Sequence, residues 1–283
     1  MAEPQIPTVD LSPFFTQDDE AGKKKAMEII TKACSEYGFF QIVNHGVPVD
    51  LLQRALELSR IFFEFPSQEK LKSSAPPDAP LPVGYNTQPQ QSPDKNEYLL
   101  MFPPGSSFNV FPQNPPQFKQ VLEDVFSKLT KTAVVVETIV NQCLGLPTNF
   151  LKEFNHDRSW DFMTALYYFP ATEFENNGLT QHEDGNCLSF VFQDDTGGLQ
   201  VLKNGKWIHV TPTKDTLIVN LDDVIQGEKW VEPLPHFTNH IGKPPFYRGF
   251  RYSEYQQLRL RNKTHPPTSP EDEIRITHYK ITT

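Results

Sequence analysis

The sequence predicts a β-rich α+β protein, with a helical N-terminal region followed by a sandwich or barrel of short antiparallel strands. Two observations carry this prediction. Amphipathic helical patterns fill much of the chain up to Leu144, and after Trp160 the texture changes to short β-rich runs separated by Gly, Asn-Gly and Thr-Pro turns. Several short strands at this spacing favour a sandwich or barrel over alternating βαβ units.

Composition sets the outer limits. With 283 residues, 37% hydrophobic and 22% charged, the chain has the profile of a globular protein with a core. A net charge of −9 disfavours nucleic acid as a partner. The N-terminus lacks the signature of a signal peptide, and no stretch approaches the roughly 20 apolar residues of a membrane span, so a cytoplasmic protein is expected. The three scattered cysteines, Cys34, Cys143 and Cys187, are expected to be buried thiols.

The elements are predicted from apolar periodicity and stop signals. The first half is expected to hold a strand at 6–11, a helix at 18–37, a strand at 39–47, a helix at 49–63 and a long helix at 118–144. Residues 73–117 carry many of the 26 prolines and are expected to form a packed loop or lid. The predicted strands of the second half are the runs ALYYF, NCLSFVFQ, GGLQVL, KWIHV and DTLIVNL.

The triplet His182-Glu183-Asp184 is the strongest candidate for chemistry. Residues i and i+2 of an extended strand point to the same face, so His182 and Asp184 can bind one metal ion while Glu183 faces away. One imidazole and one carboxylate are two of the three ligands in the facial triad that holds non-haem Fe(II). A distant histidine is then needed as the third. Alone the pattern is weak, because such triplets arise by chance and usually mark a solvated turn.

Four segments give the triplet its context. They are IPTVDLS, EYGFFQIVNHGV, FFEFPSQEK and the stretch from Gly178 to Gln226. In these segments the chain resembles the plant-type Fe(II) and 2-oxoglutarate-dependent dioxygenases, a family that includes isopenicillin N synthase, flavonol synthase and gibberellin oxidase. The resemblance covers nearly the whole chain. It implies a double-stranded β-helix, or jelly roll, of two facing antiparallel sheets with the metal at one mouth.

The resemblance also implies the cofactor chemistry. Fe(II) would be the metal, and 2-oxoglutarate and O₂ the co-substrates. In this family an Arg-x-Ser motif binds the far carboxylate of the co-substrate, since the Arg fork matches a carboxylate. The implied reaction is hydroxylation, or a related oxidation, of a small organic metabolite or hormone.

The sequence departs from the family pattern after Gln226. The family continues there through a strand with a Ser-Asn-Gly turn, the distal His, and the Arg-x-Ser strand. This chain runs directly to Gly227-Glu228-Lys229-Trp230 instead. The interpretation is a missing internal block of at least two core strands, each about 5 to 6 residues long.

An alternative alignment restores the missing groups. His240 lies 56 positions after Asp184, and Arg251-Tyr252-Ser253 follows it, so His240 is a candidate third metal ligand and Arg251 and Ser253 are candidate co-substrate anchors. The prolines at 244 and 245 oppose this alignment, because proline cannot donate ladder hydrogen bonds in a central strand. A loop histidine and an arginine at a helix start are the favoured interpretation.

The strand before the triplet shows a second departure. The family has Asn-x-Tyr-Pro there, and alignment on Pro170 places Tyr167 and Phe169 at the two polar positions. Tyr167 is therefore a candidate co-substrate contact, although a core or rim aromatic is the more frequent role. Of the other histidines, His45 is expected to brace its turn and His209 to face solvent.

Two functional hypotheses remain. The first is a cytoplasmic, monomeric oxidoreductase acting on a small, fairly apolar molecule. The second is a truncated or non-catalytic descendant without the third ligand, which would expose strand edges and be poorly stable. The expected organisation is an N-terminal region at 1–117, ending in the proline-rich loop. Residues 118–283 would hold the backing helix, a jelly-roll core at about 158–226, and a C-terminal helical tail.

Overall fold

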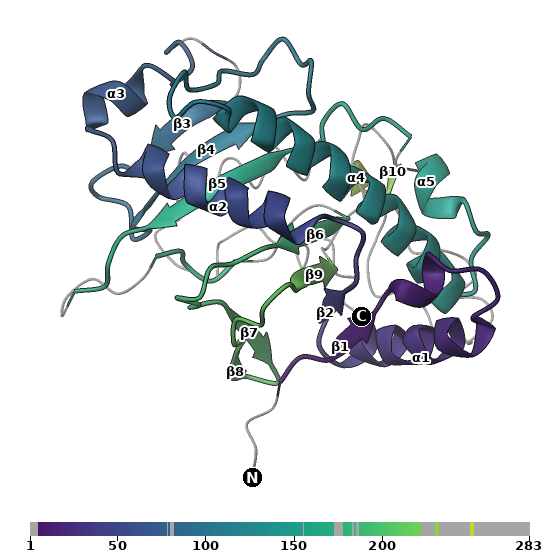
Figure 1. Ribbon diagram of the computed structural model, residues 1–283. Coiled ribbons are helices and arrows are strands. Elements are labelled where there is room, and N and C mark those ends of the chain that lie inside the picture. Colours follow the sequence, from purple (N-terminus) through teal and green to yellow (C-terminus); the bar gives the residue numbers. More distant parts are fainter. Residues whose placement is uncertain are drawn as a thin grey trace. The chain divides into compact units, whose positions relative to one another are not determined.

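The computed structural model describes residues 5–77, 79, 82–154, 156–172, 178–182, 184, 187–221, 230–231 and 250–251 (Figure 1). The chain divides into two compact units. The first consists of Met1–His182 and Phe190–Val219, and the second of Glu183–Ser189 and Asn220–Thr283. Of the expected C-terminal helical tail, only residues 230–231 and 250–251 are described, and they pair as two short antiparallel strands instead of forming a helix.

The elements follow one another in a helix-rich first half and a strand-rich second half. In chain order they are β1 (Thr8–Asp10), the 3-10 helix η1 (Ser12–Phe14), α1 (Glu20–Glu36), β2 (Phe39–Val43), α2 (Val49–Phe63), α3 (Ser67–Leu71), β3 (Gly84–Thr87), β4 (Asn96–Met101), α4 (Phe118–Cys143), α5 (Phe150–Phe154), β5 (Met163–Tyr168), β6 (Leu188–Val191), β7 (Gln200–Lys203), β8 (Lys206–His209), β9 (Leu217–Leu221), β10 (Trp230–Val231) and β11 (Phe250–Arg251).

Helix α1 illustrates how local sequence sets the predicted boundaries. Asp19 caps its start, because the Asp19 carboxylate accepts a hydrogen bond from the Gly22 N–H at 2.8 Å. At its end, the N–H groups of Tyr37 and Gly38 both donate to the Ala33 carbonyl, and Gly38 adopts a φ of +72°. Glycine reaches this left-handed conformation without strain, which is why the helix stops there.

A three-stranded antiparallel sheet, β3-β4-β5, lies under α2 and α4 (Figure 1). Strand β4 is central, and its register places Leu99 opposite both Tyr85 and Ala165. One face of the sheet packs on the two helices and forms the main core. The fully buried members of this core are Leu58, Phe62, Phe63, Tyr85, Leu99, Met101, Phe118, Leu122 and Phe126.

Strands β3 and β4 correct the expectation of a single proline-rich loop at 73–117. Both strands fall inside that segment, and β4 pairs with β5 along its whole length. The prolines lie before, between and after the two strands, where they interrupt no ladder hydrogen bond. The segment is therefore part of the sheet that carries the core.

The second sheet has the strand order β1-β2-β9-β6. Strands β1 and β2 pair in parallel, and residues 217–219 of β9 are fully buried. Strands β7 and β8 form a hairpin whose turn residues, Asn204 and Gly205, have φ values of 50° and 74°. Positive φ at both positions identifies the tight turn that Asn-Gly predicts.

A buried ion pair joins α3 to β4. The Lys70 ammonium donates to both oxygens of the Glu97 carboxylate, at 2.6 and 2.8 Å, and to the Phe63 carbonyl at 3.0 Å. The Tyr85 hydroxyl donates to the same carboxylate. Burial and this carboxylate together raise the pKa of Tyr85, so its hydroxyl stays a donor.

All three cysteines are free thiols, but each is only partly buried, where buried thiols were expected. Burial raises the pKa of Cys34 to about 12, which makes it a poor nucleophile. Within the described ranges, every helix is too short or too polar to cross a bilayer.

Candidate metal centre

His182 is exposed in a stretch without regular secondary structure, and its ring has a defined partner. The Nδ1 atom lies 2.8 Å from the Thr180 carbonyl oxygen. A carbonyl can only accept, so Nδ1 carries the proton and Nε2 keeps the lone pair. Metal-binding histidines commonly show this arrangement, in which the second ring nitrogen donates to a carbonyl or carboxylate.

Asp184, in the second unit, is held by a buried amide. Its Oδ2 accepts a hydrogen bond from Nδ2 of Asn220 at 2.7 Å. Asn220 lies near the end of β9 and is only 8% exposed. This contact orients the carboxylate through a neutral donor.

The chemistry of these two side chains fits the implied iron. An imidazole nitrogen and a carboxylate oxygen are two of the three donors in the facial triad, and each has the outer hydrogen bond that fixes a ligand. No cluster of three or more His, Cys, Asp or Glu side chains suited to a metal is found in the part of the chain that the structure describes.

The candidates for the missing groups stay predictions. His240 and Ser253 lie outside the described residues. Arg251 is described only as the backbone of β11, where it pairs with Trp230 of β10.

Tyr167 lies in the core. Its ring stacks on Phe63 with centroids 5.6 Å apart and meets Phe169 edge-on at 5.9 Å. It packs against the core cluster between β5 and α2, which is the more frequent role for such a tyrosine. Its part in binding the co-substrate stays a prediction.

The opposite face of β5 carries two half-exposed side chains and is uncharged. Leu166 and Tyr168 are 45% and 46% exposed. Across the sheet they pair with Tyr98 and Asn96 of β4, and directly opposed residues of paired strands share a face. None of the described β4 and β5 residues on this face carries a charge. Such a surface suits an apolar or aromatic partner.

His45 braces its turn, as the sequence predicts. The residue is only 2% exposed, its Nδ1 accepts a hydrogen bond from the Val47 N–H at 3.2 Å, and its carbonyl accepts one from the Thr132 hydroxyl. Burial lowers the pKa of this imidazole, although Asp215 acts in the opposite direction. His209 is exposed on β8, as expected.

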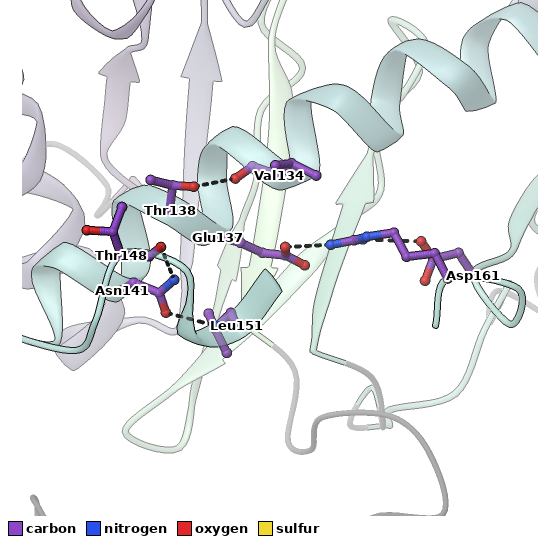
Figure 2. Close-up of polar contacts among 8 residues, drawn as sticks. Val134, Glu137, Thr138, Asn141, Thr148, Leu151 and Asp161 are labelled. Carbon is purple, nitrogen blue, oxygen red and sulfur yellow. Dashed lines mark hydrogen bonds and ion pairs between the residues drawn. The ribbon is translucent and has the colours of Figure 1, made fainter. Parts of the chain in front are cut away.

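A buried carboxylate on α4 fixes the chain that leads into β5 (Figure 2). Glu137 is 3% exposed and pairs with Arg158, which also binds Asp161 at 3.2 Å. One turn further along α4, the Asn141 side chain donates to the Thr148 carbonyl at 2.9 Å and so holds the start of α5. Sequence reasoning missed this arrangement, since Glu137 interrupts an otherwise apolar stripe without a recognisable motif.

Comparison with known proteins places these features in a family. Residues 6–118 match the model described as non-haem dioxygenase in morphine synthesis N-terminal, and residues 160–231 match the 2OG-Fe(II) oxygenase superfamily. A flavonol synthase/flavanone 3-hydroxylase of Matthiola incana is 32% identical, over 92% of this chain and 100% of the relative. The chain belongs to the 2OG-Fe(II) oxygenase superfamily. It is accordingly an oxidoreductase of the 2-oxoglutarate-dependent class, with Fe(II) as cofactor and 2-oxoglutarate and O₂ as co-substrates.

Two further relatives show the breadth of this superfamily. A 1-aminocyclopropane-1-carboxylate oxidase of Musa acuminata is 30% identical over 78% of this chain and 72% of the relative. The crystal structure of JOX2 in complex with 2OG, Fe and JA superimposes with a TM-score of 0.78, covering 99% of this chain and 91% of that one. At 23% identity this likeness concerns the fold alone, and it confirms the predicted fold family of jelly-roll oxygenases.

Proposed function

We propose that this superfamily member oxidises a small, largely apolar organic molecule, with His182 and Asp184 as two of its three iron ligands. One observation carries the assignment of the ligands. Both side chains fall in the matched range 160–231, and each has the outer hydrogen bond that a metal ligand requires.

The chain's own groups would divide the work at this site. The Thr180 carbonyl holds the Nδ1 proton of His182, so Nε2 can donate its lone pair, and Asn220 orients the carboxylate of Asp184. Bound by these donors, Fe(II) supplies the redox chemistry that couples breakdown of 2-oxoglutarate to oxidation of the substrate.

The substrate class rests on the uncharged face of β5. Relatives with similar identity to this chain are named for a flavonoid and for a cyclopropane amino acid, so identity alone does not select a substrate. The exposed side chains of Leu166 and Tyr168 favour an apolar or aromatic molecule. Leu166→Asp is expected to raise KM for such a substrate, while 2-oxoglutarate turnover without substrate stays unchanged.

A second candidate is a form of the oxygenase that has lost turnover. The alignment with the Matthiola incana relative runs over 303 positions, more than the 283 residues of this chain, so the relative carries residues that this chain lacks. The superfamily match ends at residue 231, before His240. The first observation supports a missing internal block, and the second leaves His240 outside the matched range.

Anaerobic Fe(II) titration and succinate formation from 2-oxoglutarate decide between the two candidates. Stoichiometric iron and succinate, both lost in His182→Ala, would support turnover. The same loss of iron and succinate in His240→Ala would identify His240 as the third ligand. Weak iron binding that His182→Ala does not change, with no succinate, would overturn the ligand assignment and leave the second candidate.

The two matched ranges also bear on the domain organisation. They fall at 6–118 and 160–231, on either side of most of α4. We propose the division into residues 1–117 and 118–283 on this basis.

A further inference from the structure

The backbone that precedes His182 is tied to the start of β4. The Gly178 carbonyl accepts two hydrogen bonds from this strand, one from the Asn96 side chain at 2.7 Å and one from the Lys95 N–H at 3.1 Å. Asn96 is only 1% exposed, so its amide is committed to this contact and to a second one with Gln88.

The Asp94 carboxylate holds Thr180, which lies two residues after Gly178. Its Oδ1 accepts a hydrogen bond from the Thr180 N–H at 2.6 Å. A carboxylate acceptor makes a hydrogen bond roughly twice as strong as a neutral one. The Asp94 N–H is in turn held by the Ser92 hydroxyl at 3.1 Å, which fixes the loop that presents the carboxylate.

Close packing completes the attachment at Gly178. A Cβ atom placed there would lie 2.6 Å from the Tyr168 ring on β5. That separation is too short for a side chain unless the Tyr168 ring moves, so glycine lets the backbone lie close against the tyrosine. The segment from Gly178 to Thr180 is therefore fixed by two side chains of the β4 region and by one ring of β5.

Thr180 transmits this attachment to His182. Its N–H is bound to Asp94, and its carbonyl accepts the Nδ1 proton of His182 at 2.8 Å. With its N–H bound, the peptide plane that leads into Thr180 is held, and this restricts how its carbonyl can turn. The ring nitrogen that carries the proton is set by the hydrogen bond that the ring makes, so the direction of this carbonyl decides the tautomer.

We propose that Asp94 and Asn96 are positioning residues that keep His182 in its metal-binding tautomer, by fixing the Gly178–Thr180 backbone to β4. The inference rests on the proposed role of His182 as an iron ligand. Asp94 and Asn96 touch neither metal nor substrate. They act through the Thr180 carbonyl. Asp94 lies 86 residues before Thr180, and Asn96 lies 82 residues before Gly178.

The test follows the imidazole itself, in the full chain without metal. A ¹⁵N-detected spectrum of the His182 ring distinguishes the Nδ1–H from the Nε2–H tautomer. The Nδ1–H form is expected to dominate in the original chain, and Asp94→Ala and Asn96→Ala are expected to shift it toward Nε2–H. Asp94→Asn keeps an oxygen acceptor for Thr180 and is expected to retain the original spectrum. If Asp94 had only a structural role, Asp94→Ala and Asp94→Asn would give the same His182 spectrum.

Affinity for Co(II), an air-stable substitute for Fe(II), gives the second readout. Loss of an outer contact weakens metal binding about 10- to 100-fold, and that loss is expected for Asp94→Ala and Asn96→Ala. Asn109→Ala is the matched control, because Asn109 clamps the Phe102 backbone at the other end of β4. It is expected to keep the Co(II) affinity. Gly178→Ala, which removes no hydrogen-bonding group, is expected to weaken binding as well.

The outcomes separate this inference from the proposed function. If His182→Ala abolishes Co(II) binding while Asp94→Ala and Asn96→Ala keep both the tautomer and the affinity, the positioning role is overturned and the ligand assignment stands. If His182→Ala binds Co(II) as well as the original chain, His182 is not a ligand and both fall. Should the alanine variants fail to fold, Gly178→Ala decides by the same two readouts.

Discussion

The Nζ atom of Lys70 lies 2.6 Å from Oε1 of Glu97, and the two side chains are only 8% and 4% exposed. This ion pair sits where α3 meets the central strand of the β3-β4-β5 sheet. Burying two charges is costly, so the pair contributes mainly because each charge compensates the other.

Removal of one partner is therefore expected to be severe. Lys70→Met should lower the free energy of unfolding by about 3–5 kcal/mol, because it leaves the Glu97 carboxylate buried without a counter-charge. The double variant Lys70→Met, Glu97→Leu should lose less than the single one. Urea unfolding measures both. Arg54→Met, which breaks an exposed pair with Glu57, should change stability by less than about 1 kcal/mol. Equal effects of the buried and exposed changes would contradict the expectation.

His45 gives a pH dependence with a definite sign. Burial lowers its pKa in the folded protein below the unfolded value of about 6.5, so the unfolded state binds the proton first. The free energy of unfolding should therefore fall as pH drops below about 6.5, until the folded pKa is reached. Well above pH of about 6.5, His45 should have no effect on the pH dependence of stability. Urea unfolding between pH 7.5 and 5 should show a smaller decline in His45→Gln. An unchanged decline would mean that other groups cause it.

Asn220 should matter for metal binding more than for stability. Asn220→Leu removes the donor to Asp184 and is expected to weaken Co(II) affinity about 10- to 100-fold. Asn220→Asp should destabilise the metal-free protein more than Asn220→Leu does, because two carboxylates would then face each other. Anaerobic titration measures the first effect, and thermal unfolding of the metal-free protein measures the second. Unaltered affinity in Asn220→Leu would show that Asp184 needs no such support.

Arg158 is expected to tolerate neither neutralisation nor lysine. Arg158→Met removes the guanidinium that pairs with Glu137, which is 3% exposed, and should cost several kcal/mol in urea unfolding. Arg158→Lys keeps the charge but cannot bind Glu137 and Asp161 through two separate nitrogens, so an intermediate loss is expected. Full stability of the lysine variant would indicate that charge alone is needed.

The helices were the most predictable part of this fold. Apolar periodicity and stop signals located α1, α2 and α4 to within two residues, because each buries one face along its whole length. Strands β3 and β4 were missed because their surrounding prolines indicate a loop, whereas the pairing of β4 with β5 depends on residues more than 60 positions away.

The candidate site divides along the same line. His182 and Asp184 form a local pattern that sequence reasoning can recognise, and the family comparison supports their setting. Asp94 and Asn96 follow no motif, and their contacts with Thr180 and Gly178 exist only after the strands have paired. Short-range patterns therefore find the proposed ligands, while the groups proposed to orient them require the fold.

The central position of β4 has a consequence for how this architecture can be recombined. Two separately recognisable family segments, 6–118 and 160–231, share one sheet, because β3 and β4 come from the first and β5 from the second. A chimera that exchanges the first segment between relatives would exchange two strands of that sheet and, with them, the anchor of the His182 backbone. Natural or engineered shuffling at this boundary is therefore expected to succeed only when both halves of the β4-β5 ladder are inherited together.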